Sequence, residues 1–162
     1  MQFNYFLRSK TKLTTPIVVL TFDDGPDEHF TTKILDVLKK YEISAVFFVI
    51  GSKVKNQVDL TQRIVEEGHL LGNHTFSHHP LFSMQNQLKV EKEIGECDNI
   101  VLKLTGKKPT LFRAPIGYTN PIIARAIKKL EKQSIGWTLR SYDSVFKNPM
   151  TLKKRLVSNI KN

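Results

Sequence analysis

The stretch VVLTFDDGP, residues 18–26, decides how this chain is expected to fold. A run of apolar and β-branched residues leads into two neighbouring carboxylates, Asp23 and Asp24, and a Gly-Pro pair then stops the strand. Adjacent like charges repel, and a desolvated carboxylate is costly unless a positive group lies beside it. The pattern therefore predicts a buried strand whose C-terminal tip carries an acidic site that is balanced by a cation.

The rest of the chain alternates between strand-like and helix-like patterns. Short apolar runs indicate strands, and apolar residues at helical spacing indicate helices. This alternation predicts a single α/β domain over residues 1–162 with a parallel sheet, whose active site lies at the C-terminal ends of the strands. The expected strands cover residues 17–22, 45–50, 69–72, 110–112 and 134–138, and the expected helices cover residues 31–41, 59–67, 85–104, 121–132 and 149–160.

The composition is that of one soluble globular domain. The chain has 162 residues, of which 40% are hydrophobic, and this is enough for a core of its own. The single cysteine, Cys97, excludes an internal disulfide, and we expect it to be packed in a helix. No segment approaches the roughly 20 apolar residues of a membrane span, and residues 1–16 lack the pattern of a secretory signal peptide. We therefore expect a cytoplasmic location by default, while a cell-wall role outside the cytoplasm stays open.

The net charge of +10 raises the question of a polyanionic partner. The basic pairs are scattered near expected helix ends, where cations complement the helix dipole. Solvated helix ends and a functional polyanion patch are the two interpretations of these residues. A nucleic-acid-binding surface requires clustered basic residues with stacking aromatic side chains, so no nucleic-acid partner is expected.

A second motif, GNHTFSHHP (residues 72–80), places His74 and His78 four residues apart. Imidazole is the commonest neutral metal ligand, but such a pair also occurs as surface or loop-capping histidines. An Asp at a neighbouring strand end adds an anionic third ligand, which favours a hydrolytic site of the zinc type. A divalent cation beside Asp24 also relieves the crowding of the two carboxylates, and it leaves Asp23 free to act as a base toward water.

Four motifs occur along the chain in the order TFDDGP, GNHTFSHH, FRAPIG and the tract around Trp137. Together they resemble the polysaccharide deacetylase family, also called carbohydrate esterase family 4 or the nodulation-factor deacetylase homology domain. The similarity runs over residues 17–143. It implies a distorted, incomplete (β/α) barrel and the metal-dependent hydrolysis of N-acetyl or O-acetyl groups on a polysaccharide or oligosaccharide.

The resemblance implies a role for each residue that matches a family motif. Asp23 matches the catalytic base, and Arg113 matches the arginine that pairs with this base and orients it. Asp24, His74 and His78 match the ligands of one divalent metal ion, with zinc as the first choice and cobalt or nickel as alternatives.

Three further residues match the parts of the family site that face the substrate, an acetylated glycan. The backbone N–H of Ile116 matches the donor to the oxyanion that forms when water attacks the acetyl carbonyl. Pro115 and Trp137 match the walls of the substrate groove and of the acetyl pocket. A place in the core is the alternative for Trp137.

One departure from the family pattern lies behind the catalytic residues. The family commonly has an Asp three residues after the Trp, and this Asp holds the arginine of the third motif. Arg140 occupies that place in this chain, and Asp143 follows it. We expect Arg140 and Asp143 to support the site from behind, with Asp143 in contact with Arg113 or Arg140.

A second departure concerns the general acid. The family ends with a strand of the type L-x-H, whose histidine protonates the leaving amine, and the sequence shows no such strand after Asp143. Three hypotheses follow: a truncated form, a strand supplied from elsewhere, or a weak or inactive metal- and carbohydrate-binding remnant. Tyr142 and His79 are the substitute candidates for the acid. An unfilled edge of the barrel also predicts self-association.

Overall fold

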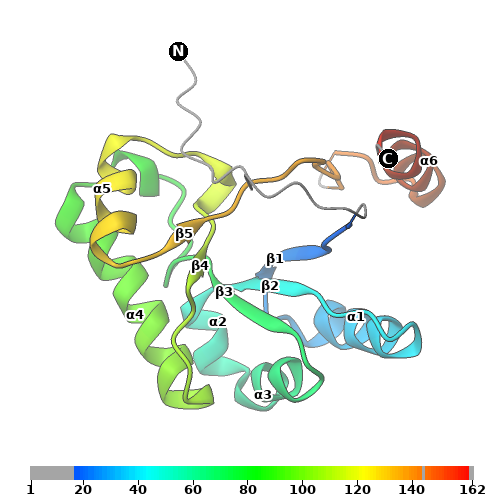
Figure 1. Ribbon diagram of the computed structural model, residues 1–162, viewed down its shortest axis with the longest axis horizontal. Coiled ribbons are helices and arrows are strands. Elements are labelled where there is room, and N and C mark those ends of the chain that lie inside the picture. Colours follow the sequence, from blue (N-terminus) through cyan, green and yellow to red (C-terminus); the bar gives the residue numbers. More distant parts are fainter. Residues whose placement is uncertain (1–16, 144, 161–162) are drawn as a thin grey trace.

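The computed structural model describes residues 17–143 and 145–160. Two expectations, that the domain starts at residue 1 and that residues 1–16 carry no signal peptide, concern a segment outside these described residues. Strands and helices alternate along the described chain (Figure 1). The strands are β1 (Thr21–Gly25), β2 (Val46–Val49), β3 (Leu70–Asn73), β4 (Leu111–Phe112) and β5 (Gln133–Ser134). The helices are α1 (Glu28–Lys40), α2 (Gly51–Asn56), α3 (Val58–Glu66), α4 (Gln87–Thr105), α5 (Pro121–Lys129) and α6 (Pro149–Asn159), with 3-10 turns η1 (Phe82–Met84) and η2 (Pro115–Gly117).

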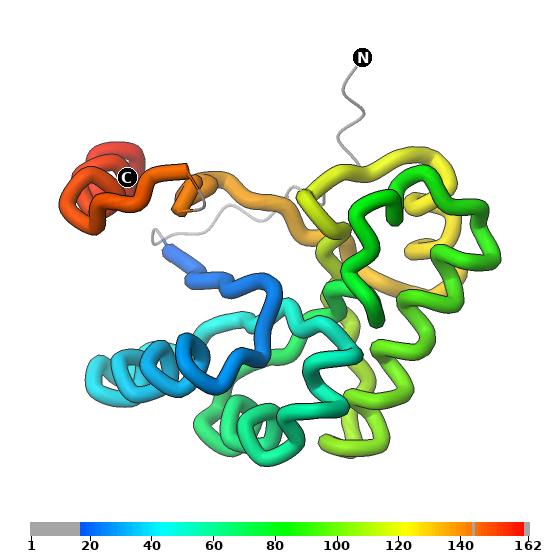
Figure 2. Tube along the Cα trace, turned by 180° about the vertical axis from the view of Figure 1, so that it is seen from behind, coloured from blue at the N-terminus to red at the C-terminus, as the bar shows by residue number. Residues whose placement is uncertain are grey.

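The strands form one five-stranded parallel sheet in the order β1-β2-β3-β4-β5. Strands that follow one another in the chain are neighbours throughout, which is the winding of a (β/α) barrel, whereas a doubly wound sheet reverses its order. The helices α1 to α5 follow one side of the curved sheet, and α6 lies apart from the α4–α5 pair in both Figure 1 and Figure 2. The predicted α/β class with a parallel sheet is therefore confirmed.

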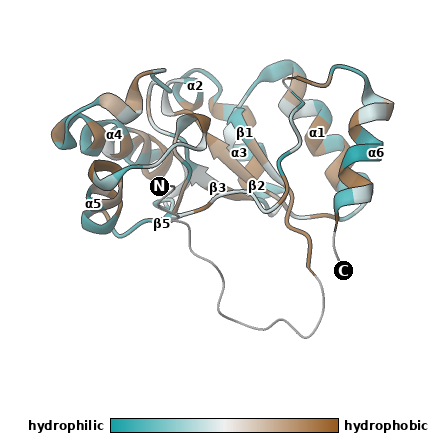
Figure 3. Cartoon of the chain, turned by 90° about the horizontal axis from the view of Figure 1, so that it is seen from above, coloured by the Kyte–Doolittle hydropathy of each residue, from teal (hydrophilic) through white to brown (hydrophobic). Residues whose placement is uncertain are grey.

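Two clusters of buried side chains fill the space between the sheet and the helices. One packs α1, α3 and α4 against β2, and the other packs α4 and α5 against β4. All of β2 is buried, as its apolar run predicts for a central parallel strand, and Cys97 is buried in α4. The helices show mixed polar and apolar surfaces in Figure 3, which is typical of helices that cover a sheet. No helix in the described part of the chain is long and apolar enough to cross a membrane.

The first strand begins later than the sequence predicts. Strand β1 starts at Thr21, whereas the prediction for residues 17–22 was based on their β-branched, apolar character. Residues 17–19 are 61–62% exposed, and the first contact with β2 is the hydrogen bond from the Val46 N–H to the carbonyl of Leu20. The prediction was wrong for residues 17–20 because strand propensity does not supply a pairing partner.

The last strand is shorter than expected, and one helix was missed. Of the predicted range 134–138, only Ser134 lies in β5, and the carbonyls of Ile135 and Gly136 accept hydrogen bonds from Arg113 instead of continuing a ladder. The helix α2 directly follows β2 and has the sequence GSKVKN, in which a glycine and polar residues hide the helical pattern.

Candidate active site

The two carboxylates at the tip of β1 are set apart by an irregularity in the sheet. Asp23 pairs with Phe48 and Gly25 pairs with Val49, so Asp24 is an extra residue between two paired ones. Its φ of +66° breaks the regular alternation of side chains along the strand. The Asp23 side chain is only 21% exposed, whereas that of Asp24 is 61% exposed. The bulge thus gives two neighbouring acids different surroundings.

The histidines come from the loop that follows β3. Nε2 of His74 lies 3.4 Å from Oδ1 of Asp24, and Nε2 of His78 lies 3.2 Å from the same oxygen. The three candidate ligand atoms all lie within 4.8 Å of one another. His74 is buried, but Asp24 is exposed and His78 is half-buried, so the cluster is reached from solvent. The structure therefore brings together the three residues that the sequence suggested as metal ligands.

The hydrogen bonding of this cluster suits a divalent cation. The Nδ1–H of His74 donates to the carbonyl of Arg113 at 2.7 Å, which leaves Nε2 facing Asp24. The His74 imidazole lowers the pKa of the Asp24 carboxyl, and burial lowers the pKa of His78 although Asp24 opposes it. An ionised carboxylate beside two imidazole nitrogens is a donor set that fits zinc, cobalt or nickel.

Arg113, directly after β4, holds the other carboxylate. Its NH1 group donates to Oδ1 of Asp23 at 2.6 Å and to the hydroxyl of Thr21 at 2.9 Å. Its Nε and NH2 groups donate to the carbonyls of Ile135 and Gly136, each at 3.1 Å. Burial lowers the pKa of Arg113, and the charge of Asp23 counters this effect. The four directional bonds fix the buried guanidinium, and one of them holds Oδ1 of Asp23 beside it.

Two aromatic rings lie against the guanidinium. Its central carbon lies 4.1 Å from the centroid of Phe48 and 4.7 Å from that of Trp137. Trp137 in turn covers Gly117, where an added Cβ would lie 2.1 Å from the indole ring. Gly117 also has a φ of +72°, so both space and backbone require glycine there. Trp137 is partly exposed, which places it at the rim of the site and not in the core.

The turn η2 presents a backbone amide at the same end of the sheet. Pro115 is buried, while Ile116 has a φ of +60° and is 61% exposed. Within the described residues, the N–H of Ile116 donates no hydrogen bond to the protein. This amide is therefore available to an anionic or carbonyl oxygen.

The chain matches a protein-family model described as polysaccharide deacetylase over residues 10–135. The chain belongs to the polysaccharide deacetylase family.

Named members of the family support this assignment. The chain is 36% identical over 143 residues to the peptidoglycan-N-acetylmuramic acid deacetylase PdaA of Bacillus subtilis, and the match covers 88% of this chain and 53% of PdaA. The solved structure of the peptidoglycan deacetylase PdaC of the same organism superimposes with a TM-score of 0.83 at 34% identity, covering 89% of this chain and 69% of PdaC. The chain thus spans about half of the length of PdaA.

A further structural match is to a variant of a pseudoenzyme. It is a mutant of a Bacillus anthracis pseudoenzyme of the CE4 family, described as having restored enzymatic activity. It matches with a TM-score of 0.82 and 25% identity, over 88% of this chain and 52% of that chain.

In the present chain, the residues after Trp137 are arranged differently from what was expected. Arg140 stacks over Trp137 at 4.7 Å and over Tyr142 at 5.4 Å. Asp143 accepts a hydrogen bond from the hydroxyl of Ser141, and no ion pair joins it to either arginine in the described part of the chain. The carbonyls that follow β5 hold Arg113 instead, so the expected contact of Asp143 is not made in this structure.

The supporting roles of Asn73, Thr75 and Lys53 were not expected from the sequence. The side-chain oxygen of Asn73 accepts the N–H of Thr75 at 2.8 Å, and the hydroxyl of Thr75 accepts the N–H of His78 at 3.1 Å. Lys53 donates to the carbonyl of Asp24 at 2.7 Å. An asparagine at a strand end is a typical loop-capping residue and was the available signal, whereas nothing in the sequence pointed to Lys53.

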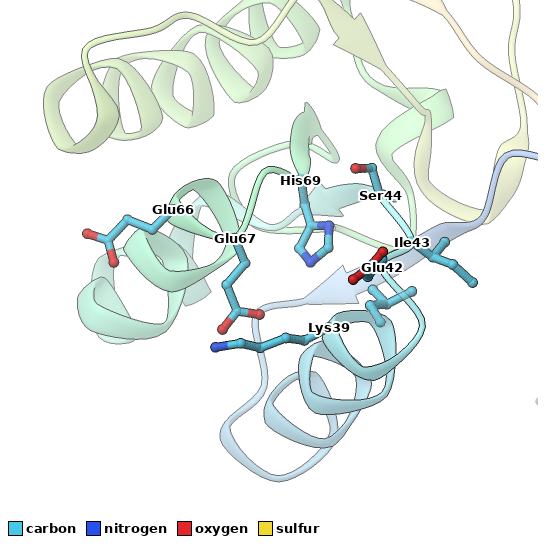
Figure 4. A pocket seen from close by; sticks show the side chains of 8 residues that line it. Lys39, Glu42, Ile43, Ser44, Glu66, Glu67 and His69 are labelled. Carbon is cyan, nitrogen blue, oxygen red and sulfur yellow. The ribbon is translucent and has the colours of Figure 1, made fainter.

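Two hollows of the structure lie away from these residues. One, of about 370 Å³, lies at the N-terminal ends of β2 and β3, and the side chains of Glu67 and His69 face it in Figure 4. The other, of about 680 Å³, lies beside α2 and α4. The acids and histidines gather at the opposite, C-terminal edge of the sheet, which is where parallel α/β folds carry their chemistry.

Proposed function

We propose that this chain is a metal-dependent hydrolase that removes N-acetyl or O-acetyl groups from a polysaccharide or oligosaccharide. The observation that carries the proposal is the convergence of Asp24, His74 and His78 beside the buried Asp23–Arg113 pair. The names of PdaA and PdaC, which are peptidoglycan deacetylases, support an acetylated glycan as the substrate.

Asp24, His74 and His78 would hold the metal ion, and zinc is our first choice because its usual protein ligands are imidazole, thiolate and carboxylate. When bound, such an ion supplies Lewis-acid polarisation of the acetyl carbonyl. The Nδ1–H bond of His74 to the Arg113 carbonyl supports this role because it fixes the imidazole with Nε2 toward Asp24.

The residues around the ligands divide the remaining tasks. Asp23 takes a proton from the attacking water, and Arg113 holds this carboxylate in place. The N–H of Ile116 donates to the oxygen that becomes negative when water attacks the acetyl carbon. Pro115 and Trp137 form the walls of the groove and of the acetyl pocket. The surroundings of the two acids support this assignment of base and metal ligand. Asp23 is mostly covered and is paired with Arg113, whereas Asp24 is exposed and faces the histidines.

Acetate release tests the proposal. The zinc-loaded chain is incubated with N-acetylated chitooligosaccharides and with soluble peptidoglycan fragments, and free acetate is measured. Asp23→Asn should lower the rate by about 10²–10⁴-fold, the usual contribution of a positioned base. The matched control is Asp36→Asn, which removes an acid that pairs with Arg63 on the surface and should leave the rate unchanged. Equal rates for the two variants would contradict the assigned base.

A second candidate function is the binding of metal and glycan without turnover. This function stays a candidate because a Bacillus anthracis protein described as a CE4 family pseudoenzyme has the same fold, with a TM-score of 0.82 at 23% identity, so the fold alone does not decide between turnover and binding. If the chain does turn over substrate, Tyr142 and His79 are the proposed substitutes for the general acid. Nδ1 of His79 accepts the N–H of Leu81 at 3.1 Å. Glycan binding by the metal-loaded chain, with no acetate released from either substrate class, would favour this second function.

A further inference from the structure

A buried ion pair lies between α4 and the segment that leads into β5. Nζ of Lys132 is 2.7 Å from Oδ1 and 2.6 Å from Oδ2 of Asp98, and the two side chains are 1% and 0% exposed. Lys132 also donates to the carbonyl of Pro109, and Lys108 approaches Asp98 from the surface at 3.6 Å. Apolar residues of similar volume are often as stabilising as a buried ion pair, so stability alone does not account for it.

The carboxylate of Asp98 fixes the orientation of a neighbouring amide. The NH2 group of Asn73 donates to Oδ1 of Asp98 and to the carbonyl of Ile94, each at 2.8 Å. Both of these partners only accept hydrogen bonds, so turning the amide around would lose both bonds and place its oxygen against two other oxygens. The Asn73 oxygen must therefore face away from α4.

That oxygen faces the loop between the two histidine ligands. It accepts the N–H of Thr75 at 2.8 Å, and Thr75 has a φ of +68°, which a β-branched residue rarely adopts. The hydroxyl of Thr75 then accepts the N–H of His78 at 3.1 Å. One continuous chain of hydrogen bonds thus runs from Lys132 through Asp98 and Asn73 to the backbone of the loop.

We propose that Asp98 and Lys132 are positioning residues that act through Asn73 to set the spacing of His74 and His78 for metal binding. The proposal rests on the metal site of the proposed function. Without an acceptor at position 98, the Asn73 amide keeps only the Ile94 carbonyl of the two partners that fix its direction, and the N–H of Thr75 loses its acceptor whenever the amide turns. The loop then relaxes from the positive φ of Thr75, and the two imidazoles separate.

Two double variants distinguish the effect of the hydrogen-bond acceptor for Asn73 from the effect of the buried charges of Asp98 and Lys132. Asp98→Leu with Lys132→Met removes both charges and the acceptor, while it keeps an apolar volume of similar size. Asp98→Asn with Lys132→Met also removes both charges, but it keeps an oxygen that can accept from Asn73 and an NH2 group that can donate to the carbonyl of Pro109. Val101→Ala, in the same helix, serves as a control for lost packing, because Val101 is buried and makes none of these contacts.

The readouts are the zinc dissociation constant and the visible absorption spectrum of the cobalt-loaded full chain. The Leu/Met variant should bind zinc about 10–100-fold more weakly, the usual effect of removing a partner behind a metal ligand, with an altered cobalt spectrum. The Asn/Met variant and Val101→Ala should stay within about threefold of the unaltered chain, since one keeps the acceptor and the other never contacts the relay.

Three results would overturn the proposal. The first is a Leu/Met variant with unchanged zinc affinity and cobalt spectrum, and the second is an equal loss of affinity in Val101→Ala. The third result concerns the unaltered, metal-free chain, in which the backbone N–H of Thr75 should exchange slowly with deuterium. Exchange as fast as that of an open loop would remove the basis of the relay. An unaltered chain that binds neither zinc nor cobalt would refute the proposed metal site itself, and so is distinguishable from failure of the relay alone.

Discussion

Arg113→Lys should damage both stability and catalysis, although it keeps the charge. The arginine makes four hydrogen bonds through three nitrogens, to Thr21, Asp23 and the carbonyls of Ile135 and Gly136. Lysine has a single nitrogen on a flexible stem and cannot reproduce this fork. We expect at least two of these buried bonds to be lost, which at about 1.5 kcal/mol for each bond to a charged group costs about 3 kcal/mol.

This cost converts into a change that is easily measured. A free energy of about 3 kcal/mol lowers the Tm of a domain of this size by roughly 6–12 °C. The Asp23 carboxylate also loses its fixed orientation, and a misplaced catalytic group lowers kcat by about 10²-fold. Thermal unfolding followed by circular dichroism and acetate release from a glycan measure the two effects. Arg125→Lys, at an exposed position of α5, is the matched control. A fall in Tm of less than about 2 °C with an unchanged kcat would refute the reasoning.

Further predictions address the loop, the pH dependence and the outer edge of the sheet. Gly117→Ala should lower the Tm and weaken substrate binding because its Cβ would lie 2.1 Å from the Trp137 ring, and both effects should shrink when Trp137 is also replaced by Leu. Burial lowers the pKa of His69 below its usual value of 6.5, and its Nδ1 accepts the Ala45 N–H. The unfolded chain therefore takes up this proton first, so the Tm of the metal-free chain should fall as the pH drops below about 6.5, and His69→Gln should flatten this part of the profile. If the exposed apolar segment before β1, residues 17–20, associates with a second copy, the mass measured by light scattering should rise with concentration, and Val18→Lys should abolish the rise; a mass that is independent of concentration would rule this association out.

The parts of the site that the sequence predicted are those in which a side chain supplies the chemistry. Asp24, His74 and His78 belong to short motifs at strand ends, and parallel strands bring such ends to one edge of the sheet. The different exposure of Asp23 and Asp24 was not predictable, because it depends on a bulge and a positive φ at Asp24. Nothing in the pattern of neighbouring acids encodes that backbone conformation.

The residues that sequence analysis missed act through the backbone or from a distance along the chain. The carbonyls of Ile135 and Gly136 hold Arg113, and a carbonyl leaves no signature in a sequence because every residue has one. Asp98 and Lys132 lie 34 positions apart, and each alone resembles a solvated helix residue. Only the fold brings them together under the histidine loop.

The metal content of three purified forms of the chain tests the central claim most directly. The unaltered chain, Asp24→Asn and Asp23→Asn are each loaded with zinc, dialysed and analysed for bound metal per chain. We predict that the unaltered chain and Asp23→Asn retain one ion, because a base does not hold the metal, and that Asp24→Asn loses it. A loss in Asp23→Asn as complete as that in Asp24→Asn, or equal zinc in all three forms, would contradict the assignment of base and ligand.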